Sequence, residues 1–264
     1  MRPTEGQVAD WEDASAYAPL READRSIFAW EWLRRAPEYR QDAARSGAAG
    51  QDVPGAAIIA DERAIRWGLH AFERPDLAGP EARPIWRREV YPSVLPARAT
   101  SGGELEDRFE LERLRDCATL VKSRSGAEHV LLSDRGRTLR LDIVSGTVCD
   151  GPVLLRFELS GMRSVLRPLL TLRQLIALWR VGQFSRALHP PEVRAARWIL
   201  LLRTYDALAA GADQRAIAAH LLDRDAAGRR WRVQAPALRS RVQRLVREAR
   251  KMAAGGYLSL LRGR

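Results

Sequence analysis

At 264 residues the chain is long enough for one large domain or two to three small ones, and 46% hydrophobic with 29% charged residues is ordinary for a globular protein. Its two cysteines, Cys117 and Cys149, are too few and too far apart for a disulfide scaffold or a CxxC metal site, which argues for a reducing compartment and against redox or zinc chemistry. The formal net charge of +11 favours an anionic partner.

The N-terminal end carries no sign of export or membrane insertion. Its first ten residues contain no apolar segment of the kind found in secretion signals, and the densest apolar stretch, residues 198–202, is far shorter than a membrane span. We therefore expect a cytoplasmic protein with no membrane partner.

Residues 1–46 have aromatic and aliphatic residues near helical spacing, which predicts a small helical module whose pattern is interrupted at Pro37. For Trp11, Trp30 and Trp32 we favour burial in a core, and a docking surface for RNA polymerase or another partner is the alternative. Residues 47–59 are rich in glycine and small residues, which predicts a linker.

Residues 60–104 form a proline-rich segment with one short helix predicted over residues 61–72. Five prolines between residues 75 and 96 leave little room for further regular structure. We expect Trp67, Trp86 and Tyr91 to dock this segment onto a neighbouring part of the fold.

Residues 105–264 are predicted to combine a sheet with a helical domain, which makes the fold class α+β. Four short β-type runs are separated by glycines, and their spacing predicts a central antiparallel β-meander. The runs are residues 118–121, 129–132, 138–144 and 153–159.

After residue 161 the periodicity becomes helical to the end of the chain. The predicted helices are residues 162–183, 191–210, 213–222 and 236–254. Pro191 suits the first position of the second helix and Asp213 the N-cap of the third. Gly255 and Gly256 are expected to end the last helix, after which Tyr257 and the following leucines return to the core.

Most of the excess positive charge lies in this last part of the chain. Residues 211–264 contain 13 Arg or Lys against 4 Asp or Glu, whereas residues 1–210 contain 31 against 29. Only two of the 44 basic residues are lysine, a bias that codon usage alone can produce, so the placement of the arginines carries the information and their number does not. Such clustering is typical of a surface that binds phosphate.

The helix that begins near Pro236 is amphipathic. An apolar stripe runs from Leu238 through Val242 and Leu245 to Ala253, and a polar, basic face lies opposite. From this projection we expect one set of residues near the helix start to approach base edges and another set to meet phosphates. The first set is Arg239, Ser240, Gln243 and Arg244, and the second is Arg247, Arg250, Lys251, Arg229, Arg230 and Arg232.

Residues 213–222 followed by this basic helix resemble a helix-turn-helix unit whose second helix enters the major groove. The connection, residues 223–235, is longer than the usual three or four residue turn. It would therefore act as a wing or extended loop that offers its arginines to phosphates.

The C-terminal part of the chain resembles a known family. Residues 238–246, then Gly255-Gly256-Tyr257 and Leu260-Leu261, are similar to the C-terminal DNA-binding domain of RovC-type bacterial transcriptional activators, and the likeness runs from about residue 105 to the end. Residues 11–42 resemble a small N-terminal module of regulators from integrative and conjugative elements, and Trp67-Gly68-Leu69 followed by Trp86 extends that likeness.

The resemblance implies a sequence-specific transcriptional regulator that binds double-stranded DNA, activates mobile-element or secretion genes and works as a homo-oligomer. Two alternatives stay open. An RNA-binding regulator would use the same basic helix on single-stranded or structured RNA, and an antiactivator would act by protein–protein interaction.

Catalytic and cofactor chemistry is not predicted. His70, His129, His189 and His220 are scattered without the spacing of a metal cluster or catalytic dyad. No glycine motif of the dinucleotide or P-loop type is present. We therefore expect no enzyme activity, no cofactor and no metal.

Overall fold

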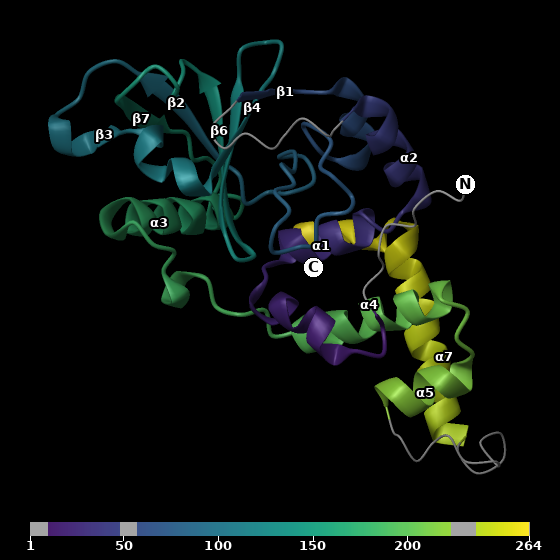
Figure 1. Ribbon diagram of the computed structural model, residues 1–264. Helices are drawn as coiled ribbons and strands as arrows, with labels where there is room; N and C mark the ends of the chain where they lie inside the picture. The colour runs from purple at the N-terminus through teal and green to yellow at the C-terminus, as the bar shows by residue number, and fades with distance from the viewer. Residues whose placement is uncertain (1–9, 48–56, 223–235, 264) are drawn as a thin grey trace.

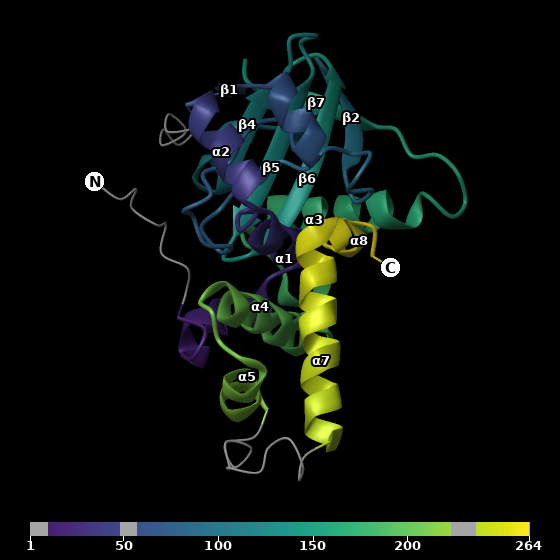
Figure 2. The same cartoon turned by 90° about the vertical axis from the view of Figure 1, so that its right-hand side faces the viewer.

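The computed structural model describes residues 10–47, 57–222 and 236–263. A sheet with α3 against it forms one end of the molecule, and a group of helices from both ends of the chain forms the other (Figure 1). In a view turned by 90°, α5 and the first half of α7 project away from the sheet (Figure 2). Within the described residues, no helix has both the length and the apolar character needed to cross a bilayer.

The N-terminal helices predicted over residues 1–46 are present. They are the 3-10 helix η1 (Ala14–Glu22), α1 (Arg25–Leu33) and α2 (Pro37–Ser46). Asp24 caps α1, because its carboxylate accepts hydrogen bonds from the backbone N–H groups of Ser26 and Ile27. Pro37 starts α2, where its missing N–H costs nothing.

The sheet has seven strands in the order β1-β4-β5-β6-β2-β7-β3. The strands are β1 (Ala57–Ile59), β2 (Leu95–Thr100), β3 (Arg108–Phe109), β4 (Ala118–Lys122), β5 (Glu128–Asp134), β6 (Arg137–Ser145) and β7 (Val153–Phe157). Short 3-10 helices connect them: η3 (Glu62–Trp67), η4 (Leu105–Asp107) and η5 (Leu111–Cys117).

The predicted antiparallel β-meander is wrong as a description of the whole sheet, which is mixed. Strands β4, β5 and β6 are antiparallel neighbours as expected, but β2 lies between β6 and β7 and is parallel to β6. The short β1 runs parallel to β4 at one edge. The sequence pattern located the four runs, and the strand inserted among them comes from a segment that was expected to be irregular.

Strand β2 contains Pro96, one of the five prolines that led us to predict little further regular structure in this segment. Pro96 lies near the start of the strand, beside an irregularity in the β2–β6 register between Ala97 and Arg98, and its carbonyl still accepts a hydrogen bond from the backbone N–H of Glu158 at 3.2 Å. The ladder continues through Ala97, Arg98 and Ala99, each paired with β7.

The helices after residue 161 follow the predicted order. They are α3 (Leu166–Val181), η6 (Arg186–Leu188), α4 (Ala195–Ala209), α5 (Gln214–Leu221), α7 (Pro236–Lys251) and α8 (Leu258–Leu261). Pro191 does not start a helix, because α4 begins four residues later at Ala195. A π-helical turn, Met252–Gly256, ends α7, and Gly255 has the positive φ of 99° that favours glycine there.

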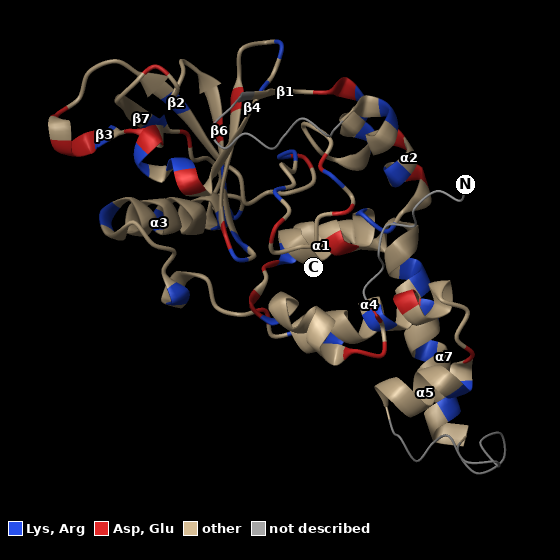
Figure 3. Cartoon of the chain, viewed as in Figure 1, with Lys and Arg blue, Asp and Glu red and all other residues tan. Residues whose placement is uncertain are grey.

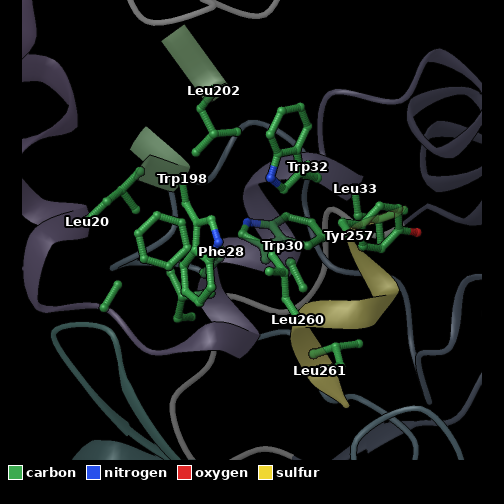
Figure 4. Packing of buried hydrophobic residues seen from close by; sticks show 14 of the residues in the cluster. Leu20, Phe28, Trp30, Trp32, Leu33, Trp198, Leu202, Tyr257, Leu260 and Leu261 are labelled. Carbon is green, nitrogen blue, oxygen red and sulfur yellow. The ribbon is translucent and has the colours of Figure 1, made fainter. Parts of the chain in front are cut away.

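Two large hydrophobic cores hold these elements together. One lies between the sheet and α3, with Leu175 and Leu178 packed on strand residues such as Leu141. The other joins the N-terminal helices to α4, α7 and α8 (Figure 4). In that core, Trp30, Trp32 and Phe28 of α1 are nearly fully buried, as is Leu202 of α4, and Tyr257 and Leu260 return to it as predicted.

Within the second core, a buried ion pair links α1 to α4. The Arg35 guanidinium donates to both carboxylate oxygens of Asp206, at 2.7 and 2.8 Å, and also pairs with Glu31. The Tyr17 hydroxyl donates to Asp206 at 2.6 Å. Burial alone would raise the pKa of Glu31, but attraction to Arg35 and Arg34 holds that pKa below its ordinary value.

We expect Asp206→Ala to lower the free energy of unfolding by about 3–5 kcal/mol, because it leaves the Arg35 guanidinium buried without its bidentate partner. Urea denaturation measures this loss. The control is Glu158→Ala, which removes the half-exposed partner of Arg98 and should cost less than about 1 kcal/mol. Equal losses of unfolding free energy in the two variants would show that the buried Arg35–Asp206 pair contributes no more to stability than the exposed Arg98–Glu158 pair.

Candidate nucleic-acid interface

Helices α4, α5 and α7 pack around a small core of their own. Ala207 of α4, Ile217 and Ala218 of α5, and Val242 and Val246 of α7 meet there. Trp11 joins this core from the N-terminal end of the chain, and its ring lies edge-on to His220 at 5.1 Å. The three helices are therefore positioned by residues from both ends of the sequence.

Helix α5 begins where the sequence predicted. The Asp213 carboxylate accepts a hydrogen bond from the backbone N–H of Ala216 at 2.7 Å, which is the N-cap interaction expected of an aspartate there. Ile217 is fully buried against α7. This short helix supports α7 from the side.

Helix α7 has the two faces that the sequence predicted. Val242, Leu245, Val246 and Ala249 are buried, and Leu238 is half-buried at the start of the same stripe. On the opposite face, six of the predicted site residues are exposed: Ser240, Gln243, Arg244, Arg247, Arg250 and Lys251. Figure 3 shows basic residues recurring along the length of α7.

Two of the expected groups differ from this arrangement. Arg239 is half-buried and has an interaction partner, so it lies at the edge of the exposed face. Arg229, Arg230 and Arg232 lie outside the described residues, as does the whole connection from residue 223 to 235.

The basic face carries one acidic residue, Glu248, which forms an ion pair with Arg197 of α4. Arg194, near the start of α4, is also exposed. Sequence projection of a single helix missed Arg197 because it belongs to another helix, and its contact with α7 depends on tertiary packing. Arg197 also lies outside residues 211–264, the segment in which the sequence analysis located the excess positive charge.

A second cluster, away from α7, brings together residues that are distant in sequence. The rings of His70 and His129 stack with centroids 3.4 Å apart and an interplanar angle of 19°. Nδ1 of His129 lies 2.7 Å from a carboxylate oxygen of Asp142, and Arg140 donates to that same oxygen at 3.0 Å. The sequence interpretation of scattered histidines did not foresee this contact, because the four residues come from η3's C-terminal connection, β5 and β6.

His70, His129 and Asp142 offer three ligand atoms within 4.8 Å of one another, so they are the candidates for a metal site. The geometry is poor for one. The imidazole lone pairs lie in the ring planes, and the lone pairs of two stacked, nearly parallel rings with centroids 3.4 Å apart cannot both point at one ion about 2 Å from each nitrogen. Arg140 also occupies the shared carboxylate oxygen. We therefore interpret the cluster as structural.

Two family models match the chain. Residues 161–262 match the T6SS transcription factor DNA-binding domain, of RovC type, and residues 10–70 match a proteobacterial transcriptional regulator-like domain. A search of curated proteins gave no match. The two matches confirm the resemblance to RovC-type regulators and indicate a DNA-binding transcriptional regulator, although the DNA-binding match begins at residue 161 and not at about residue 105. Helices α3, α4, α5, α7 and α8 all lie in the first matched segment.

The histidine stack predicts a dependence of stability on pH. Burial, with the nearby His129 and Arg140, lowers the pKa of His70 to about 3. A histidine that binds its proton more weakly when folded contributes stability above its unfolded pKa of about 6.5 and loses it as the pH falls toward 3. We expect His70→Gln to remove a slope of up to about 1.4 kcal/mol per pH unit from urea denaturation between pH 6.5 and 4. His220→Gln, at an exposed site, is the control; an unchanged slope in His70→Gln would contradict the assignment.

Proposed function

We propose that the chain is a sequence-specific regulator that binds duplex DNA through the exposed face of α7. One feature supports this function most strongly. Arg244, Arg247, Arg250 and Lys251 are exposed on one helix whose other face is anchored by Val242 and its neighbours. A rigid helix with this distribution matches the width and the charge of a DNA major groove.

The position of α7 in the fold suits its insertion into a DNA groove. Its N-terminal half lies at the end of the molecule farthest from the sheet (Figure 2). The helix dipole adds partial positive charge at that end, and the first turn contains no acidic side chain. Ser240, Gln243 and Arg244 would then read base edges, with Arg239 at the margin.

The remaining basic residues would contact phosphates. Arg247, Arg250 and Lys251 lie farther along α7, toward the body of the protein. In a helix-turn-helix-like arrangement, α5 would support α7 from behind, and Arg229, Arg230 and Arg232 of the connection would reach the backbone. These contacts would fix the orientation of the helix and leave sequence choice to its first half.

Duplex DNA is favoured over single-stranded RNA by the location of the aromatic residues. Proteins that recognise unpaired bases stack them on exposed aromatic rings. In the described part of the matched segment, Trp198, Tyr257 and Phe184 are buried and Trp179 and Tyr205 are half-buried, so they offer no open stacking platform beside α7.

We extend the proposal to activation of secretion or mobile-element genes by a homo-oligomer that contacts RNA polymerase. The T6SS description of the matched family supports the first part. Burial of Trp30 and Trp32 makes these residues unsuitable as the polymerase contact. A reporter gene carrying the bound DNA sequence should be transcribed more when the protein is present.

Arg244→Ala tests the assignment of α7. With a duplex selected from a randomised pool, we expect the variant to lose about 1–3 kcal/mol of binding free energy, if Arg244 is bidentate to guanine, and to lose less on a scrambled duplex. Fluorescence anisotropy across a salt series measures both affinities.

The matched control is Arg124→Ala, which removes an 80% exposed arginine from the β4–β5 turn. It should leave both affinities nearly unchanged. Equal losses of Arg244→Ala on selected and scrambled DNA would place Arg244 among the phosphate contacts, and no loss on either would contradict an interface on α7.

A further inference from the structure

Helix α7 carries a single carboxylate among many cations. It contains five arginines and one lysine, and Glu248 is its one acidic residue. Side chains three and four residues apart lie next to each other on a helix, with about 5–6 Å between their Cβ atoms. The cations that neighbour Glu248 along α7 are therefore Arg244, four residues before it, and Lys251, three residues after it.

In the structure, Glu248 pairs with neither of these neighbours. Its carboxylate accepts a hydrogen bond from the guanidinium of Arg197, which belongs to α4. Arg244 and Lys251 are exposed, and within the described residues neither has a carboxylate partner. The charge of Glu248 is thus neutralised from outside α7, and the two cations nearest to it are left available for phosphates or bases.

Packing holds α4 at the distance from α7 that this pair requires. Trp198, the residue after Arg197, is buried, and its ring lies edge-on to Phe28 of α1 with centroids 4.9 Å apart. Ala249, the residue after Glu248, is buried in the same core. Because each partner is followed by a residue of one shared core, the packing of the two helices brings the two side chains together.

Removal of Arg197 would change the charge that DNA meets. Glu248 would be left beside Arg244 and Lys251, and the order of Glu248 and Lys251, with the acidic residue first, is the favourable one for an ion pair on a helix. A cation that pairs with Glu248 must give up that pair before it can contact a phosphate. If Glu248 stayed unpaired, its negative charge would repel the phosphates directly. In either case the affinity for DNA would fall.

We propose that Arg197 is a positioning residue of the DNA interface: it binds Glu248, and so leaves Arg244 and Lys251 free to contact DNA. The proposal rests on the assignment of α7 to DNA made above. It gives Arg197 no DNA contact of its own, so the effect of Arg197 must act through Glu248. A direct contact between Arg197 and a phosphate is the alternative that the experiment has to distinguish.

A double-mutant cycle on the full chain tests the proposal, with fluorescence anisotropy on a duplex selected from a randomised pool as the measurement. Arg197→Ala should weaken binding by about three- to tenfold. Glu248→Gln should not weaken it, because the amide that replaces the carboxylate has no charge to neutralise. In the Glu248→Gln background, Arg197→Ala should have no further effect.

A conservative variant and a matched control complete the set. Arg197→Lys keeps a cation opposite Glu248 and should restore most of the affinity, since the pair uses a single hydrogen bond and does not need the fork of a guanidinium. The control is Arg115→Ala, which removes the arginine from an exposed pair with Glu112 in η5 and should leave the affinity unchanged. Near-ultraviolet circular dichroism verifies that each variant is folded.

The same loss from Arg197→Ala in the wild type and in the Glu248→Gln background would show that Arg197 contacts DNA itself, and would overturn the proposal. Unchanged binding by Arg197→Ala in the wild type would overturn it as well. The variant Arg244→Ala separates this failure from failure of the proposed function. If Arg244→Ala weakens binding while Arg197 and Glu248 show no coupling, only the role of Arg197 is wrong; if Arg244→Ala also has no effect, the assignment of α7 to DNA is wrong.

Discussion

The arrangement of the helices depends on the buried contact between Arg35 and Asp206. A bidentate guanidinium–carboxylate pair accepts only a narrow range of geometries, and here both partners are almost completely buried. Since Arg35 follows α1 and Asp206 lies near the end of α4, the pair fixes the relative position of the two helices. Tyr17 and Glu31 complete its hydrogen bonds, so the charges are not left unpaired in the core.

Much of the candidate interface follows from that constraint. Helix α4 supports both α5 and α7, and Trp11 closes the same small core from the N-terminal side. The regulator-like segment and the DNA-binding segment are therefore joined by shared cores, and are not merely tethered.

The sequence predicted what depends on neighbouring residues and failed where distant segments meet. The cap at Asp213, the two faces of α7 and the return of Tyr257 to the core are local or periodic features, and they are confirmed. The insertion of β2 between β6 and β7, and the stacking of His70 on His129, require pairings across tens of residues that no periodicity records. Arg197 of α4, which reaches the basic face through its ion pair with Glu248, was missed for the same reason.

The most direct measurement is photo-crosslinking from a single cysteine at position 243, with Cys117 and Cys149 replaced by serine, to a duplex selected by the protein. A probe on the exposed face of α7 should crosslink to bases of that duplex, and a probe at exposed Ser125, in the β4–β5 turn, should not. Equal crosslinking from both positions, or crosslinking from position 125 alone, would contradict the claim that α7 enters the DNA groove.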